Sequence, residues 1–297
     1  MRRVGVLALA VALHLILHSS ANAQETESFA DVHIHYNWDQ LDHITTREIV
    51  KRLERANVEF AVATSTPSRL VDELKREGGD RVIPFFSPYL HEDGRRDWFV
   101  DEAVIAAAEE GLKKGRYEGV GEIHFMSGFR PKPNNRVFER LMGLAAEYEV
   151  PALVHVDAGS ERAIVNICSR HPAVNILFAH AGGNLRPKHV EAVIEKCPRI
   201  LIELSARDPW RYGRLTDDDG KLLPKWRDVI VRYPHRFVVG TDPVWRVTRT
   251  QSWDEIDEGW DYFGRLIQYH RGWLAPLPAH VRRAVARDNA ARLFGRL

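Results

Sequence analysis

Short apolar runs alternate with amphipathic segments along the chain from Phe29 to the C-terminus. Each run is bounded by turn or polar residues, which is typical of strands in a parallel sheet. The pattern predicts eight strands, at Phe29–His35, Phe60–Ser65, Val82–Tyr89, Val120–Phe125, Pro151–Asp157, Asn175–Ala181, Ile200–Ser205 and Phe237–Asp242. Every segment between them is long enough to hold a helix. The sequence therefore predicts a single (β/α)8 TIM barrel.

Residues typical of helix ends occur between the predicted strands. Thr45 and Glu48 have the spacing of a capping box at the start of the first helix. Prolines and glycines mark other ends, with Pro67, Pro187 and Pro224 at expected starts and Gly78, Gly79 and Gly115 at expected ends. A doubly wound open sheet is the main alternative, but it requires a glycine-rich phosphate loop after its first strand. The sequence has His35-Tyr36-Asn37-Trp38 there instead.

Ionisable residues stand at or near the carboxyl ends of five of the apolar runs. They are His33, His35, Glu122, His155, His180 and Asp242. Burying such groups is costly unless they are paired or bind a metal. In a barrel, the carboxyl ends of the strands form one face, and residues two apart on a strand point the same way. Imidazole and carboxylate groups suit Zn²⁺, and also Mn²⁺, Fe²⁺ or Co²⁺, so the pattern predicts a site for one or two divalent ions.

These motifs together resemble those of the amidohydrolase superfamily. The resemblance rests on His33-x-His35, on His155, on His180 within Ala179–Gly183, and on Asp242 within Gly240–Pro243. It is strongest to the amidohydrolase-related branch that includes aminocarboxymuconate-semialdehyde decarboxylase, and it covers essentially the whole chain after the N-terminal segment. It implies a metal-dependent barrel enzyme.

The resemblance also implies roles for individual residues. His33, His35, His155 and Asp242 match the ligands of mononuclear members. Glu122 matches the acid that bridges two metals in DNase-like binuclear members, and His180 would then bind the second metal. In mononuclear relatives the histidine at this position is a catalytic hydrogen-bonding group. No lysine occupies the strand-four position, which argues against a carbamate-bridged centre.

The roles of three polar residues are open to two interpretations each. Glu122 is either a bridging ligand or a carboxylate that holds a ligand histidine. His124 shares a strand face with Glu122, so it either lines the pocket or forms an ordinary hydrogen bond. Asp157 shares a face with His155, and a role in capping a helix or a loop is the favoured one.

The predicted reaction is hydrolysis of an ester, lactone, amide or similar bond in a small organic substrate. A bound divalent ion lowers the pKa of water to about 7 and polarises a carbonyl oxygen. Asp242 would accept the proton of that water, and His180 would donate a hydrogen bond to the developing oxyanion. A decarboxylase or hydratase of the same superfamily is the nearest alternative, since fold alone does not fix function. A non-catalytic solute-binding barrel is a more remote one.

Loops after the fourth, seventh and eighth strands are rich in arginine and tryptophan. Arginine matches the geometry of carboxylate and phosphate groups, so an anionic substrate is one expectation. Arg207 and Arg246 are the best candidates because they follow strand ends closely. Trp245 is placed to form part of the substrate wall.

The N-terminus has the features of a cleavable signal peptide. Arg2 and Arg3 precede an apolar stretch over residues 4–17, and Ala21-Asn22-Ala23 is a cleavage signal. The prediction is a signal peptide at 1–23, a barrel at 24–297, and export to the periplasm or beyond the cell; an uncleaved anchor is the alternative. The formal net charge is +1 for the full chain and −1 after loss of Arg2 and Arg3, which gives no argument for nucleic-acid or membrane partners.

Two questions stay open at the level of sequence. Cys168 and Cys197 are the only cysteines, and they are either two buried thiols or a disulfide permitted by an oxidising compartment. The chain is either a monomer or a homodimer. The expected partner is a small-molecule substrate in both cases.

Overall fold

Eight parallel strands form the centre of the molecule. The computed structural model describes residues 27–125, 131–156, 160–244 and 256–297. Its strands are β1 (Phe29–His35), β2 (Val58–Thr64), β3 (Val82–Phe86), β4 (Gly119–Phe125), β5 (Ala152–Val156), β6 (Ile176–Phe178), β7 (Ile200–Glu203) and β8 (Phe237–Val238). They lie side by side in chain order. Main-chain hydrogen bonds from Val32 N to Val239 O and from Asp242 N to His33 O join the last strand to the first. The predicted (β/α)8 barrel is confirmed.

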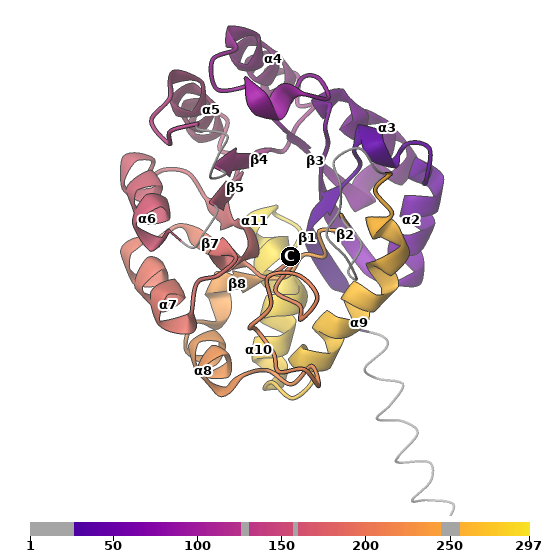
Figure 1. The fold of residues 1–297 in the computed structure, drawn as a ribbon, viewed down its shortest axis with the longest axis vertical. Helices are drawn as coiled ribbons and strands as arrows, with labels where there is room; N and C mark the ends of the chain where they lie inside the picture. The colour runs from indigo at the N-terminus through magenta and orange to yellow at the C-terminus, as the bar shows by residue number, and fades with distance from the viewer. Residues whose placement is uncertain (1–26, 126–130, 157–159, 245–255) are drawn as a thin grey trace, which may run out of the picture.

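Helices surround the strands, as Figure 1 shows. They are α2 (Thr46–Arg55), α3 (Val71–Gly78), α4 (Glu102–Lys113), α5 (Arg136–Glu147), α6 (Glu161–Arg170), α7 (Pro187–Lys196), α8 (Pro224–Arg232), α9 (Phe263–Leu274), α10 (Ala279–Arg283) and α11 (Asn289–Leu293). Their ends follow the predicted signals. Thr45 Oγ1 accepts a hydrogen bond from Glu48 N at the start of α2. Pro187 and Pro224 are the first residues of α7 and α8.

The hydrophobic side chains form two separate cores. The larger core lies between strands and helices. The smaller one is an apolar floor inside the barrel, where Val32, Phe85 and Leu153 pack with Ala290 and Ala291 of α11. The C-terminal helix therefore covers the amino-terminal end of the barrel, and the polar groups of the strands gather above the floor.

Irregular strand pairing lets the same strands carry both the apolar floor and polar groups. Val32 belongs to the floor and Ile34 to the outer core, although residues two apart share a face on a regular strand. The pairing of β1 with β2 shifts register between Asp31 and Ile34. Bulges of this kind re-aim side chains next to active sites. The shift brings His33 and His35 to the inside of the barrel.

Strands β3, β6, β7 and β8 end two to four residues earlier than predicted, and at β6 and β8 the difference affects the site. Asn175–Ala181 and Phe237–Asp242 were the predicted ranges, but β6 ends at Phe178 and β8 at Val238. His180 and Asp242 instead have positive φ angles of 56° and 48°. Non-glycine residues adopt this left-handed conformation rarely, and it occurs often at functional sites where surrounding contacts hold it. The chain turns at these two residues, so they belong to the barrel rim and not to the strands.

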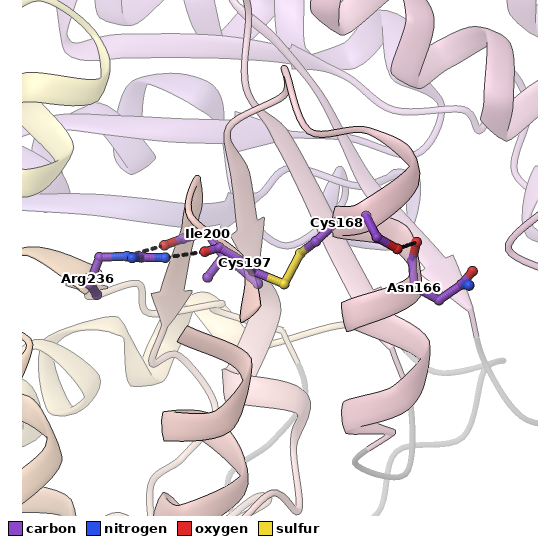
Figure 2. The surroundings of a disulfide bond; sticks show 6 residues. Asn166, Cys168, Cys197, Ile200 and Arg236 are labelled. Atoms are coloured by element: carbon purple, nitrogen blue, oxygen red, sulfur yellow. Dashed lines mark hydrogen bonds between the residues drawn. A yellow bond between two sulfur atoms is a disulfide. The ribbon is translucent and has the colours of Figure 1, made fainter. Parts of the chain in front are cut away.

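Cys168 and Cys197 form a disulfide, which resolves the alternative left open by the sequence. Cys168 lies in the last turn of α6 and Cys197 directly follows α7, with their Cα atoms 5.6 Å apart. Figure 2 shows the bridge joining these neighbouring helices. The predicted signal peptide at 1–23 lies outside the described residues. Within the described part of the chain, no helix is long and apolar enough to cross a membrane.

Candidate metal centre

All six predicted site residues meet at the carboxyl ends of the strands. His33 and His35 come from β1, Glu122 from β4 and His155 from β5, while His180 and Asp242 follow β6 and β8. Every one of these side chains is buried. Strand ends far apart in the sequence are brought to one cavity because the barrel closes β8 onto β1.

Glu122 lies among five imidazole rings. Its Oε2 is 3.3 Å from His33 Nε2, 3.2 Å from His35 Nε2 and 3.2 Å from His124 Nε2. Its Oε1 is 2.8 Å from His155 Nδ1 and 3.5 Å from His180 Nε2. A single carboxylate cannot neutralise five protonated imidazoles, whereas neutral imidazoles that surround a carboxylate are a typical set of metal ligands.

Possible ligand atoms fall into groups that differ from the predicted set. His33, His35 and Asp242 form one group, and Glu122, His124 and His155 form another, each with its ligand atoms within 4.8 Å of one another. A third group joins His33 and His180 to Glu203. His155 was predicted to share an ion with His33, His35 and Asp242, but it lies with Glu122 and His124.

Glu203 is a buried acid that sequence reasoning missed. Its Oε2 is 3.0 Å from His33 Nδ1, and it also accepts hydrogen bonds from His180 N at 3.1 Å and Ser205 Oγ at 2.7 Å. A proton on His33 Nδ1, held by this carboxylate, leaves the lone pair of Nε2 directed into the cavity. The signal was present in the sequence, because Glu203 ends an apolar run just as Glu122 does.

The electrostatics of the site favour a cation. Burial opposes protonation of His33, but Glu122 and Asp242 raise its pKa well above the usual value. Burial also opposes ionisation of Glu122, yet the charge of His33 and hydrogen bonds from His124 and His155 hold its pKa well below the usual range. The pKa of Glu203 is about 2, because the hydrogen bond and charge of His33 outweigh the effect of burial. A divalent ion would supply the positive charge that these carboxylates favour.

His124 lines the cavity, and Tyr89 holds its ring. The Tyr89 hydroxyl accepts a hydrogen bond from His124 N at 3.0 Å and lies 2.6 Å from His124 Nδ1. Burial lowers the pKa of His124 to about 3, so the ring is neutral. A neutral ring with its Nε2 beside Glu122 suits either a ligand or a hydrogen-bond donor. Asp157, the third residue with alternatives, lies outside the described residues.

His180 is held by groups on β7 and the loop after it. Its Nδ1 is 2.8 Å from Ser205 Oγ, and its Nε2 is 3.2 Å from His155 Nδ1. The ring of Tyr212 lies beside it at a centroid distance of 5.4 Å. These contacts fix the imidazole at the wall of the cavity, where a substrate atom near the metal ligands is within its reach.

The outer part of the cavity is polar. Beyond the residues already named, its lining consists of Asn37, Asp39, Arg95, Tyr212, Val244 and Asp257. Arg95 is the arginine in this lining. It comes from the loop after β3, which the sequence did not single out. This mixture of one cation and two carboxylates suits a small polar substrate better than an apolar one.

The structure does not support the predicted contact between Arg207 and substrate. The Arg207 side chain is buried against the helical layer, with its guanidinium 4.9 Å from the centre of the Trp226 ring. Its Nη2 donates to Leu185 O. Proximity to a strand end was a poor guide, because the side chain turns outward. Arg246 and Trp245, the other two predicted substrate contacts, lie outside the described residues.

Comparisons with known proteins identify the family. The family model described as amidohydrolase matches residues 30–296. The chain therefore belongs to the amidohydrolase superfamily and is an enzyme, as the motifs predicted. A search of curated proteins found no match.

Solved structures share the fold at low sequence identity. The TatD homolog YjjV from Escherichia coli K12 is 16% identical, with a TM-score of 0.64 over 90% of this chain and 98% of that one. A putative 2-pyrone-4,6-dicarboxylic acid hydrolase from Pseudomonas putida is 15% identical, with a TM-score of 0.62 over 91% and 98%. A 2,6-dihydroxybenzoate decarboxylase in complex with 2,6-dihydroxybenzoate is 13% identical, with a TM-score of 0.56 over 91% and 100%.

Proposed function

We propose that this enzyme is a metal-dependent hydrolase that cleaves an ester, lactone, amide or similar bond in a small polar substrate. One observation carries the proposal, which is the convergence of five imidazoles and three carboxylates in a single buried cluster. Glu203 supports it, because a carboxylate behind a histidine is the arrangement that orients metal ligands. A cluster built only for stability would not need five buried histidines.

The ligands divide between two positions in this proposal. His33, His35 and Asp242 hold one ion, and Glu122, His124 and His155 provide a second position. His180 is a further candidate ligand there, because its Nε2 lies 3.5 Å from Glu122 Oε1. Imidazole and carboxylate donors suit Zn²⁺, Mn²⁺, Fe²⁺ and Co²⁺, and Zn²⁺ is the ion proposed first. Glu122 lies between the two groups of ligands, so binding of a metal ion at the second position depends on it.

Asp242 and His180 are the residues proposed to act on the substrate. When bound, a divalent ion makes water a better nucleophile and polarises the bond to be cleaved. Asp242 Oδ1 lies 3.3 Å from His35 Nε2, so the carboxylate is placed to take a proton from the attacking water. His180 borders the same cavity, where its ring can stabilise the negative charge that develops on the substrate.

Decarboxylation is the second candidate reaction. It is favoured by the likeness to 2,6-dihydroxybenzoate decarboxylase, while the likeness to the 2-pyrone-4,6-dicarboxylic acid hydrolase favours hydrolysis. The substrates in both of those names carry carboxylates, and Arg95 lines the cavity of this enzyme, where a guanidinium matches the geometry of such a group. Product analysis separates the two reactions, because one releases CO₂ and the other a hydrolysed bond.

Export completes the proposal. The predicted signal peptide at 1–23 supports it, and so does the disulfide, because disulfides persist in oxidising compartments. N-terminal sequencing of the protein recovered from the periplasm or medium tests this directly. A mature chain that begins at Gln24 is the expected result.

The test of function uses protein purified without added metal. Esters, lactones, amides and aromatic carboxylates are screened before and after removal of metal with a chelator. We expect turnover of at least one class, loss of that turnover on chelation, and recovery when Zn²⁺ is returned. Turnover that survives complete metal removal would contradict the proposal.

A further inference from the structure

Arg211 is a buried arginine in the segment that follows β7. Its side chain is 4% exposed. Asp208, itself buried, anchors the guanidinium at 2.8 Å from Arg211 Nε and 2.7 Å from Nη2. The rest of the guanidinium is directed at the turn that carries Asp242.

The guanidinium contacts three acceptors of that turn. Arg211 Nη1 donates to Asp242 O at 2.5 Å, and Nη2 donates to Thr241 O at 2.9 Å. Nη1 also lies 3.6 Å from Asp242 Oδ2. A planar fork of donors can satisfy several oxygens at fixed angles, which a lysine ammonium cannot do.

Other residues complete the support of the same turn. Thr241 N and Oγ1 donate to the two carboxylate oxygens of Asp31, at 2.9 and 2.6 Å. Asp242 N donates to His33 O at 2.7 Å. The left-handed conformation of Asp242, with its φ of 48°, is therefore held by bonds on both sides of the peptide. Among the residues that the structure describes, Arg211 supplies the side-chain hydrogen bonds to both carbonyl groups.

The result is a fixed orientation of the Asp242 carboxylate. Oδ1 faces the histidines, at 3.3 Å from His35 Nε2 and 3.9 Å from His33 Nε2. Oδ2 faces Arg211. We infer that Arg211 is the positioning residue that sets which oxygen of Asp242 is presented to the metal position. This inference rests on the proposed function, since it assigns Arg211 a role through a proposed ligand.

A matched control exists at the opposite end of the barrel. Arg236 also donates to two main-chain carbonyls, Ile200 O at 2.8 Å and Cys197 O, as Figure 2 shows. It lies just before β8 and far from the histidines along that strand. Replacing either arginine by lysine keeps the charge and removes the fork. A purely structural effect should therefore be common to both variants.

The experiment measures metal binding and does not need the substrate. Wild type, Arg211→Lys, Arg211→Gln and Arg236→Lys are titrated with Zn²⁺ against a competing chelator. The visible spectrum of each Co²⁺-loaded protein then reports the coordination. We expect Arg211→Gln to bind Zn²⁺ about 10–100-fold more weakly than wild type, with an altered Co²⁺ spectrum. The Zn²⁺ affinity of Arg211→Lys should lie between those of wild type and Arg211→Gln. The Zn²⁺ affinity and Co²⁺ spectrum of Arg236→Lys should match those of wild type.

Two outcomes decide the inference. Wild-type affinity and an unchanged spectrum in Arg211→Gln would overturn it while leaving the proposed function intact. A wild-type protein that binds no metal would overturn the proposed function and this inference with it. If Arg211→Gln does not fold, Asp208→Asn loosens the same guanidinium from its anchor. That variant should then shift the Co²⁺ spectrum, and an unchanged spectrum would count against Arg211.

Discussion

The two ends of the barrel interior bury very different side chains. At the amino-terminal end, Phe60 and Phe85 contact Phe294 edge to face and close the barrel with an apolar floor. At the carboxyl end, histidines and carboxylates occupy the same interior, and none of the six predicted site residues is exposed. Packing of the floor stabilises the fold, whereas burying ionisable groups costs free energy unless they are paired. Stability and chemistry therefore belong to opposite ends of the same strands.

The largest expected effect is at the polar end. Asp242→Asn keeps the size of the side chain and removes the group proposed to accept a proton. We expect turnover to fall about 10²–10⁴-fold, while the thermal unfolding midpoint changes little. Activity assays and circular dichroism on the same sample would check both parts. A variant that keeps wild-type turnover would remove Asp242 from the proposed chemistry.

A substitution in the floor should have the opposite result. Phe85→Ala deletes a fully buried ring, and we expect a loss of about 3–5 kcal/mol in the free energy of unfolding. Metal content per folded chain should stay at the wild-type value. Denaturant unfolding and elemental analysis together test this separation. If the folded variant lost its metal, the two ends of the barrel would not be independent.

The disulfide should contribute to stability alone. Replacing both Cys168 and Cys197 by serine opens a bridge that spans 29 residues of sequence. We expect the free energy of unfolding to fall by about 2–4 kcal/mol, because the unfolded chain gains freedom. The affinity for Zn²⁺ should not change, since the bridge lies between helices outside the barrel. Calorimetry and chelator competition measure the two quantities separately.

Glu203→Gln should have the smallest effect of the four substitutions considered. Glutamine keeps the shape and one acceptor oxygen, but it removes the charge behind His33. We expect Zn²⁺ to bind about 10-fold more weakly, at the low end for residues that hold a metal ligand. Titration with Zn²⁺ against a competing chelator would measure this loss of affinity. An unchanged affinity would mean that His33 is oriented without Glu203.

Sequence patterns were sufficient to predict the barrel and six of the buried residues at its polar end. Alternation of apolar runs and helices located all eight strands, because nearly all strand residues are buried. The pattern failed where long-range contacts override local periodicity. The left-handed turns at His180 and Asp242, and the register shift in β1, depend on hydrogen bonds to distant strands.

The directions of individual side chains could not be predicted from the sequence either. Arg207 and Arg211 are four residues apart in one loop, and sequence alone gave no reason to prefer the second. The structure turns Arg207 toward Trp226 and Arg211 toward Asp242. Glu203 could have been found from the sequence, since an acid at the end of an apolar run is the signal that identified Glu122.

Metal analysis of protein purified without added metal tests whether the buried histidines and carboxylates hold divalent ions. We expect one or two equivalents of a divalent metal per chain, with zinc as the first candidate. If both positions are filled in the wild type, replacing Glu122 by Gln should remove one equivalent. Protein that contains no metal, takes none up from Zn²⁺ solution and keeps its activity with a chelator present would contradict the account.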